Sequence, residues 1–203
     1  MTRTRTVATA AMMLFVLSGV GHAAKVGEPA PDFTGTDSHG KTVRLADLKG
    51  KFVVLEWHNQ GCPFVVKHYD SGNMQRLQKQ LTEQGVVWLT VISSAPGKQG
   101  YVTGEQEKKY LEEKHAAPTN VLFDPQGTLG QLYGAKTTPH MFIIDDKGVL
   151  VYAGAIDDKS GTSQSEIATA NNYVLAAFTE ARAGKPVTTS STAPYGCSVK
   201  YKD

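Results

Sequence analysis

The sequence predicts an α/β fold in which helices flank a central mixed β-sheet, and two observations lead to this prediction. In the first part of the chain, short apolar runs alternate with segments of helical spacing, in the order expected of parallel β-α-β crossover units. Late in the chain, residues 140–144 and 149–153 flank the sequence Asp-Asp-Lys-Gly, which is typical of an antiparallel β-hairpin. Parallel units followed by a hairpin place strands of both directions in one sheet.

The strands of the first part are predicted from short apolar runs, the first of them rich in β-branched and aromatic residues. These runs are residues 52–57, 86–92 and 120–123. Between the first two, residues 64–81 have the apolar spacing of a helix, and Ser71-Gly72 predicts a break within it. Residues 127–133 predict one or two further helical turns.

The remaining helices are predicted from capping signals. Thr103 and Gln106 have the spacing of a capping box, which predicts a polar helix over 105–115. The same spacing at 163–166 is expected to start a last, more apolar helix, which ends before Pro186.

The composition excludes several classes of protein. The chain has 203 residues, of which 40% are apolar and 20% charged, so it is long enough to bury a core and unlike a disordered chain. Two cysteines are too few for a disulfide-dense mini-protein or a zinc ribbon. Without Arg3 and Arg5, the 21 basic residues become 19 and balance 19 acidic ones. This balance argues against a nucleic-acid partner, which needs clustered positive charge.

Residues 1–23 have the pattern of a secretory signal peptide. Two arginines precede the apolar stretch 8–20, and Gly21-His22-Ala23 places small residues before a cleavage point at Ala24. The alternative is a membrane anchor, but the apolar run of about 14 residues is shorter than the roughly 20 that a span needs. We therefore expect a periplasmic or secreted protein without a membrane span after cleavage, in a compartment where disulfides persist.

The expected organisation has three parts. Residues 1–23 form the signal peptide, residues 24–187 a single domain, and residues 188–203 a C-terminal tail that carries Cys197.

A cysteine stands where the buried strand 52–57 is expected to lead into a helix. Pro63, which follows Cys62, is favoured in the first turn of a helix because its missing N–H would be unpaired there. A thiol at this point faces free backbone N–H groups and the positive end of the helix dipole, which stabilise the nucleophilic thiolate. Three further titratable side chains lie nearby in the sequence: His58, Lys67 and His68. Cys62 is a candidate nucleophile, and the alternative is a buried structural cysteine.

Three other segments accompany this junction. They are residues 26–33 (VGEPAPDF), residues 40–51 (GKTVRLADLKGK) before the first buried strand, and residues 137–145 (TTPHMFIID). With the Cys62 junction, they resemble the thioredoxin superfamily, and most closely its peroxiredoxin-like branch of exported redoxin proteins, over about residues 25–155. The last segment resembles the family's cis-proline segment.

The resemblance implies a thioredoxin-like fold and a thiol chemistry. Cys62 would be the nucleophile, and Pro63, Thr138 and Pro139 would position a partner beside it. The partner would be a protein thiol or disulfide, or a peroxide. The resemblance implies no cofactor and no metal, because the electrons come from another thiol.

The chain also departs from the family. A thioredoxin-type redox pair is Cys-x-x-Cys, and Val65 stands at the second position, so a local dithiol switch is impossible. Peroxiredoxins have Thr or Ser three residues before the reactive cysteine, where this chain has Asn59. The arginine that they place beside the peroxide has no clear counterpart, since Arg76 and Arg182 lie in predicted helices with surface patterns. These differences argue against peroxidase activity.

Cys197 lies in a terminal segment that is too apolar for a disordered tail, with Tyr195, Val199 and Tyr201 around it. An even pair of cysteines in an exported chain makes a Cys62–Cys197 disulfide the simple expectation. Cys197 then either resolves a mixed disulfide or sulfenic acid formed on Cys62, or holds a permanent bridge. A free Cys197 is the third possibility.

The leading hypothesis is an exported thiol–disulfide oxidoreductase with Cys62 as nucleophile and Cys197 as resolving partner. The first alternative is a thiol-dependent peroxidase with an antioxidant role. The second is a redox-inert binding module for a protein or a metal, in which His58, Cys62 and His140 would gather around copper.

Overall fold

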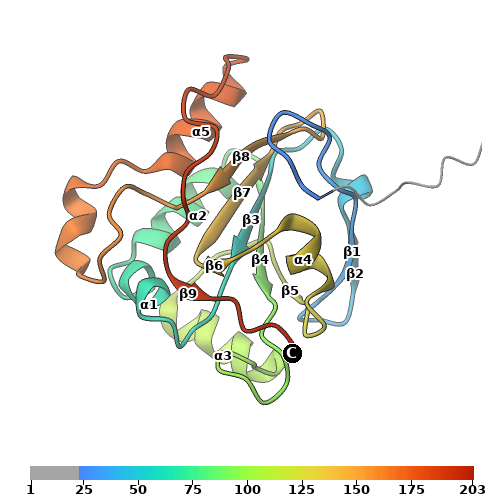
Figure 1. The fold of residues 1–203 in the computed structure, drawn as a ribbon, viewed down its shortest axis with the longest axis vertical. Helices are drawn as coiled ribbons and strands as arrows, with labels where there is room; N and C mark the ends of the chain where they lie inside the picture. The colour runs from blue at the N-terminus through green and yellow to red at the C-terminus, as the bar shows by residue number, and fades with distance from the viewer. Residues whose placement is uncertain (1–22) are drawn as a thin grey trace, which may run out of the picture.

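A mixed seven-stranded sheet forms the centre of the fold in the computed structural model, which describes residues 23–203 (Figure 1). The strands are β1 (Thr34–Asp37), β2 (Thr42–Arg44), β3 (Val53–Trp57), β4 (Val87–Ile92), β5 (Asn120–Phe123), β7 (His140–Ile144) and β8 (Leu150–Gly154), in the order β2-β1-β5-β4-β3-β7-β8. β3, β4 and β5 are parallel, whereas β7 runs antiparallel to β3 and forms a hairpin with β8. The sheet confirms the predicted α/β class with strands of both directions.

Helices cover both faces of the sheet. They are α1 (Pro63–Asp70), α2 (Asn73–Thr82), α3 (Gly104–Lys114), α4 (Thr128–Tyr133) and α5 (Tyr173–Arg182), with the 3-10 helices η1 (Leu45–Leu48) and η2 (Gln164–Thr169). Side chains of α1, α2 and α5 pack into one hydrophobic cluster, and those of α4 and η1 into another. Among the described residues, no helix combines the length and apolar character needed to cross a membrane. Residues 1–22 of the predicted signal peptide lie outside the part of the chain that the structure describes.

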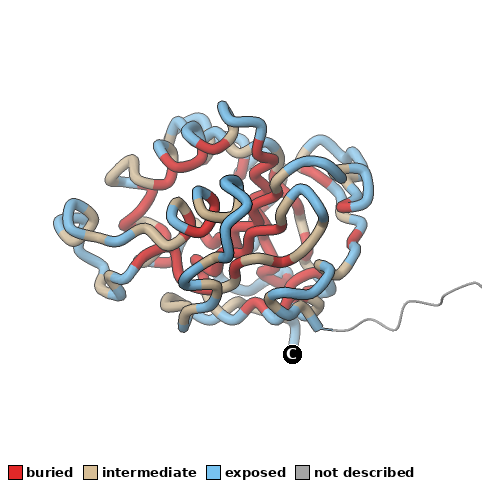
Figure 2. Tube along the Cα trace, turned by 90° about the horizontal axis from the view of Figure 1, so that it is seen from above, coloured by how far each residue is buried: buried red, intermediate tan, exposed pale blue. Residues whose placement is uncertain are grey.

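Successive side chains of β3 point to opposite faces of the sheet and therefore belong to two different cores. Val54 belongs to the cluster beneath α1, α2 and α5, whereas Val53 and Leu55 belong to the cluster beneath α4. All residues of β3 are buried, because both faces of the sheet are covered. Figure 2 shows the buried residues, in red, gathered in the interior of the fold. The same alternation directs Glu56 to the side of Val54, which places a carboxylate inside the first core.

At two places the local structure is the one that the sequence predicts. Gly72 has a φ of 69° and separates α1 from α2, as expected from Ser71-Gly72. The capping box of α3 is complete: Gln106 N donates to Thr103 Oγ1 at 3.3 Å, and Thr103 N donates to Gln106 Oε1 at 2.8 Å.

The predicted start of the last helix is wrong. Within the described residues, Ser163 makes no capping bond, because its Oγ pairs with Ser165 Oγ at 2.8 Å, and the Glu166 carboxylate is engaged in an ion pair with Lys67 at 3.0 Å. The segment forms the short η2 instead, and α5 starts separately at Asn172, whose Oδ1 accepts from Leu175 N at 2.8 Å. The carboxylate that would complete a capping box thus pairs with a lysine of a distant helix instead.

The C-terminal tail packs against the body of the fold. Its short strand β9 (Cys197–Ser198) pairs antiparallel with β6 (Thr137–Thr138), and this pair is separate from the main sheet. Tyr195 packs against the first hydrophobic cluster and Val199 against the second. The expectation that the terminal segment is docked is therefore confirmed.

Candidate functional site

Cys62 directly precedes the first residue of a helix, beside the edge of β6. It is the N-cap of α1, and Pro63 is the first residue of that helix. The Cys62 side chain is fully buried, and its thiol donates a hydrogen bond to the Thr138 carbonyl at 3.0 Å. The Thr138–Pro139 peptide bond is cis. The residues that the sequence singled out in two distant segments therefore meet at one place.

Cys197 reaches the same place from the C-terminal tail. It is the direct pairing partner of Thr138 in the β6–β9 ladder. Both cysteines are free thiols, so the structure describes the reduced state of the expected pair. The Thr138 hydroxyl is buried and has no other hydrogen-bond partner among residues 23–203, which leaves it free to donate to a Cys62 thiolate.

The two thiols differ in acidity. Burial alone would raise the pKa of Cys62, but hydrogen bonds from the Cys197 thiol, the Thr138 side chain and the backbone N–H groups of Val65 and Cys197 lower it below its ordinary value. The Thr138 carbonyl accepts the thiol proton in the hydrogen bond described above and so acts against this effect. Burial and the neighbouring Cys62 raise the pKa of Cys197 to about 11. The geometry thus favours a thiolate on Cys62 and a proton on Cys197.

We expect the rate of Cys62 alkylation to rise with pH through a midpoint below about 8.5, the usual value of a free thiol. The sign follows from the thiolate being the reactive form: a lowered pKa shifts the whole profile to lower pH. Peptide mapping after iodoacetamide treatment of the reduced protein separates the two cysteines, and Cys197 should show the higher midpoint. The reverse order of midpoints, or a Cys62 midpoint at or above the free value, would favour a structural cysteine.

A buried carboxylate lies behind the site. Glu56 accepts hydrogen bonds on Oε1 from the Tyr69 hydroxyl at 2.8 Å, and on Oε2 from Trp88 Nε1 at 2.8 Å and from Gln78 and Thr90 at 3.2 Å each. Burial alone would raise the pKa of Glu56, but His58 and these donors lower it below its ordinary value. Glu56 is therefore ionised inside the core.

His58 connects this carboxylate to the region of Cys62. Its Nδ1 lies 3.6 Å from Glu56 Oε1, and its ring packs against the rings of Tyr69 and Tyr110. Burial alone would lower the pKa of His58, but Glu56, Glu107 and Cys62 raise it. Burial raises the pKa of Glu107, whose carboxylate oxygens have no hydrogen-bond partner in the part of the chain that the structure describes. A positive His58 would therefore compensate the charge of Glu56 and favour the thiolate of Cys62.

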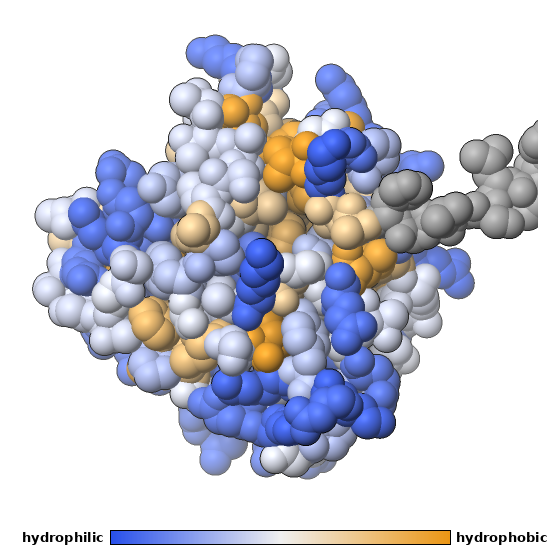
Figure 3. All heavy atoms as spheres, in the orientation of Figure 1, coloured by the Kyte–Doolittle hydropathy of each residue, from blue (hydrophilic) through white to orange (hydrophobic). Residues whose placement is uncertain are grey.

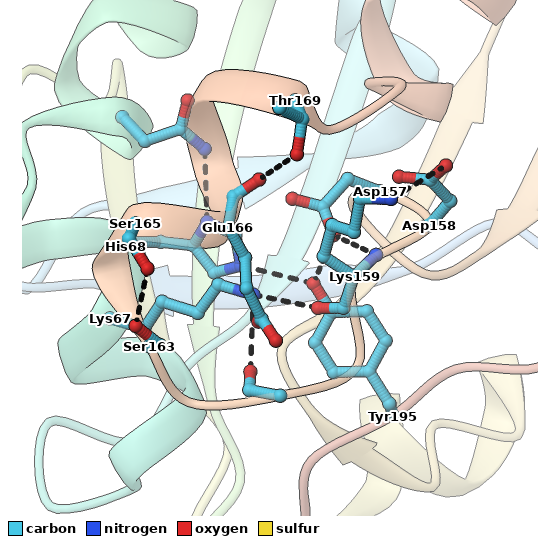
Figure 4. A network of polar contacts seen from close by, with 12 residues as sticks. Lys67, His68, Asp157, Asp158, Lys159, Ser163, Ser165, Glu166, Thr169 and Tyr195 are labelled. Atoms are coloured by element: carbon cyan, nitrogen blue, oxygen red, sulfur yellow. Dashed lines mark hydrogen bonds and ion pairs between the residues drawn. The ribbon is translucent and has the colours of Figure 1, made fainter.

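A second polar network fixes the tail beside α1 (Figure 4). The Tyr195 hydroxyl donates to Asp157 Oδ1 at 2.6 Å and accepts from His68 Nε2 at 3.1 Å. Asn73 Nδ2 donates to His68 Nδ1 at 2.9 Å, so the His68 ring is the neutral Nε2–H tautomer. Burial lowers the pKa of His68 to about 4, which keeps it in this form at neutral pH. The buried Lys67 Nζ binds Glu166 and two backbone carbonyls of the same loop.

Other residues named by the sequence do not join the site. His140 packs on Phe142 in the second core, whereas His58 lies against the first, so the two histidines are on opposite faces of the sheet. Within residues 23–203, no group of three or more His, Cys, Asp or Glu side chains is arranged to hold a metal ion. The copper arrangement of His58, Cys62 and His140 is therefore contradicted.

Several important residues were missed by the sequence reasoning. Glu56 carried a signal, because a charged residue inside an otherwise apolar strand must be paired when it is buried. No sequence signal indicates Glu107 or Tyr110, since their helix is polar on all sides and has the pattern of a surface helix. The contact of Tyr195 with Asp157 joins two loops and has no local sequence signature.

The mixed sheet, the cysteine at the start of α1 and the cis-proline segment beside it define a thioredoxin-fold protein. The chain belongs to the AhpC/TSA family, whose model matches residues 26–153. It lies in the redoxin branch of the thioredoxin superfamily, as the sequence resemblance implied.

Curated relatives and solved structures agree with this assignment. Thiol-disulfide oxidoreductase ResA of Halalkalibacterium halodurans is 24% identical over 128 residues, which cover 63% of this chain and 67% of that protein. ResA of Bacillus cereus is 26% identical over 152 residues, covering 69% and 82% of the two chains. An uncharacterized conserved protein from Geobacillus kaustophilus is similar in structure, with a TM-score of 0.74 and 27% identity over 88% of this chain and 93% of that one. The thioredoxin domain of a thiol-disulfide oxidoreductase from Bacteroides vulgatus shares the fold at a TM-score of 0.50 and 22% identity, over 72% of this chain and 98% of that one.

Proposed function

We propose that this protein is an exported thiol–disulfide oxidoreductase in which Cys62 is the nucleophile and Cys197 the resolving partner. The observation that carries the proposal is that two thiols meet beside Thr138, one with a lowered pKa (Cys62) and one with a raised pKa (Cys197). Relatives named thiol-disulfide oxidoreductase support the reaction class. Pro63, Thr138 and Pro139 are proposed to position the partner, since all three adjoin the nucleophile or its hydrogen-bond acceptor.

In the proposed reaction the Cys62 thiolate attacks one sulfur of a partner disulfide. A bond forms between Cys62 and the partner, the partner's own S–S bond breaks, and the leaving sulfur takes a proton. Solvent supplies that proton. Cys197 then gives up its own proton and attacks the Cys62 sulfur as a thiolate, and the second partner sulfur leaves and takes that proton as a thiol. The Cys62–Cys197 dithiol is oxidised to a disulfide, and the partner disulfide is reduced by the same two electrons. Run in reverse, the same steps oxidise a partner dithiol.

The proposal includes export and the division of the chain. The pattern of residues 1–23 supports cleavage before Ala24, which leaves a domain at 24–187 and a tail at 188–203 in the periplasm or outside the cell. N-terminal sequencing of protein from the cell envelope checks this, and a chain that retains Arg3 in the cytoplasm would refute it.

The test of the proposed function is the redox equilibrium of the cysteine pair in protein taken from the cell envelope. A bridge that must open and close in each cycle should have a potential above about −300 mV, the region below which secreted structural disulfides lie. Equilibration with thiol–disulfide buffers, followed by acid quenching and mass spectrometry, measures the oxidised fraction. A bridge that resists reduction at −300 mV is structural. A Cys62 that reacts with no disulfide after gentle reduction favours the redox-inert module.

Peroxidase activity is the second candidate, because the matching family model is AhpC/TSA. We expect it to be weak, with a rate constant below about 10⁵ M⁻¹s⁻¹ for hydrogen peroxide. The side-chain amide of Asn59 is already occupied: Nδ2 donates to Gln99 O at 3.3 Å and Oε1 at 3.2 Å, and Oδ1 accepts from Gly61 N at 2.9 Å. Arg76 binds the carbonyl of Ser71 instead of the site. Stopped-flow measurement of Cys62 oxidation by hydrogen peroxide decides the question. A rate constant above that limit would favour the peroxidase over the thiol–disulfide oxidoreductase.

A further inference from the structure

The nucleophile is closed to a protein partner in the structure. Cys62 is fully buried, and the C-terminal tail lies against it. Cys197 contacts the Cys62 thiol, and the Tyr195 ring packs 5.9 Å from the ring of Phe64, the second residue of α1. A disulfide on another polypeptide can therefore reach Cys62 only when this part of the tail moves aside.

The tail is held at this place mainly as an added strand (Figure 1). Cys197 and Ser198 pair with Thr138 and Thr137, and Val199 N donates to Lys136 O at 3.0 Å. These bonds involve backbone groups, which any extended polypeptide carries. The edge formed by residues 136–138 can thus accept a different strand in the same register when the tail leaves.

The surface around the tail offers little else for recognition. Figure 3 shows this face of the molecule, on which hydrophobic side chains form small patches separated by hydrophilic ones. A partner on this face would therefore be recognised by backbone pairing and by individual side-chain contacts, not by a broad apolar area.

The contacts of the tail show which side chains can be bound at this place. Two residues before Cys197, the Tyr195 hydroxyl is bound by Asp157 and His68. Directly before Cys197, Gly196 has a φ of 135°, and a Cβ there would lie 2.1 Å from the Thr138 carbonyl oxygen. Only glycine fits this position in this register. Farther along, the Tyr201 hydroxyl donates to Ala135 O at 2.7 Å.

We propose that the tail occupies the partner site of this protein, and that the partner is an extended polypeptide with an aromatic residue and a glycine directly before its cysteine. The partner displaces the tail from residues 136–138 and brings its cysteine to the place of Cys197. This rests on the proposed function and names its substrate class. After the Cys62 thiolate forms the mixed disulfide and the partner's leaving thiol departs, the tail returns, Cys197 attacks Cys62, and the partner cysteine is released as a thiol.

The experiment uses the full mature chain carrying Cys197→Ser, so that Cys62 is its only thiol. The probe is the peptide acetyl-Ala-Pro-Tyr-Gly-Cys-Ser-Val-Lys-amide, its cysteine in a mixed disulfide with thionitrobenzoate, whose release is followed by absorbance. Two control peptides carry alanine in place of the glycine or serine in place of the tyrosine. We expect the first peptide to react with Cys62 at least about tenfold faster than the alanine peptide, because the added methyl group meets the Thr138 carbonyl.

A second comparison tests the displacement of the tail. Tyr201→Phe removes the bond to Ala135, and we expect it to speed the reaction of the glycine peptide about fivefold. Tyr101→Phe, at a tyrosine that is 44% exposed, is the matched control and should leave the rate unchanged. Equal rates for the glycine and alanine peptides overturn the proposed partner, and so does a Tyr201→Phe rate equal to that of its parent. If Cys62 reacts neither with the peptides nor with free 5,5′-dithiobis(2-nitrobenzoate), the proposed function itself fails.

Discussion

A Cys197→Ser variant should accumulate mixed disulfides between Cys62 and its partners and lose at least about 100-fold in turnover of a disulfide substrate. The reason lies in the acidity of the pair. Cys62 remains a nucleophile, because the Thr138 side chain and the backbone N–H groups of Val65 and residue 197 still stabilise its thiolate. No other thiol in the chain can attack the resulting bond, since Val65 replaces the second cysteine of a local pair.

The measurement is electrophoresis without reductant after the variant is incubated with cell-envelope proteins. Cys62→Ser and the double variant are the controls, and both should trap nothing and be inactive. A Cys197→Ser protein that traps nothing and turns over substrate like the wild type would show that the tail cysteine is not a resolver. Trapping that persists in Cys62→Ser would assign the nucleophile to Cys197.

Replacement of Glu56 by alanine should lower the free energy of unfolding by about 3–5 kcal/mol. The carboxylate binds Tyr69, Gln78, Trp88 and Thr90 inside the core, and the substitution leaves these four donors without their acceptor. It also leaves His58 without its ion-pair partner at 3.6 Å. Urea denaturation followed by tryptophan fluorescence measures the loss.

Two variants make the Glu56 experiment specific. Glu56→Gln should cost less, because its amide oxygen can face the three donors at the Oε2 position while its NH2 group faces Tyr69. Glu83→Ala removes a carboxylate from an exposed pair with Lys79 at 3.9 Å and should change stability by less than about 0.5 kcal/mol. A loss below about 1 kcal/mol for Glu56→Ala would mean that the buried network does not stabilise the fold.

The main elements of the fold follow from local patterns in the sequence. β3 was predicted because a run of apolar residues in a sheet covered on both faces needs no alternation. The helix break at Gly72 and the cap of α3 also depend on neighbouring residues alone. In contrast, β1 and β2 were not predicted. Their sequences, Thr-Gly-Thr-Asp and Thr-Val-Arg, are short and polar; β1 forms because the edge of β5 accepts it, and β2 because it pairs with β1.

Part of the candidate site could also be predicted. A cysteine before proline at the end of a strand indicates a helix N-terminus, and the resemblance of residues 137–145 to the family's cis-proline segment indicated the segment that meets it. The electrostatic surroundings could not be predicted. Glu107 belongs to a helix whose pattern is that of a surface helix, and it is buried only because α3 packs over His58 and Tyr110 lies against the same ring.

By itself, the sequence determined the fold class, the position of Cys62 at the start of a helix and the absence of a second cysteine beside it. These features depend on residues a few positions apart, whose spacing sets the local backbone. Only the tertiary structure decided that Cys197 meets Cys62, that Gly196 faces the Thr138 carbonyl, and that Tyr195 is bound by Asp157 and His68. These contacts join segments far apart in the chain, and they exist because the tail gains backbone hydrogen bonds and apolar contacts by lying along β6.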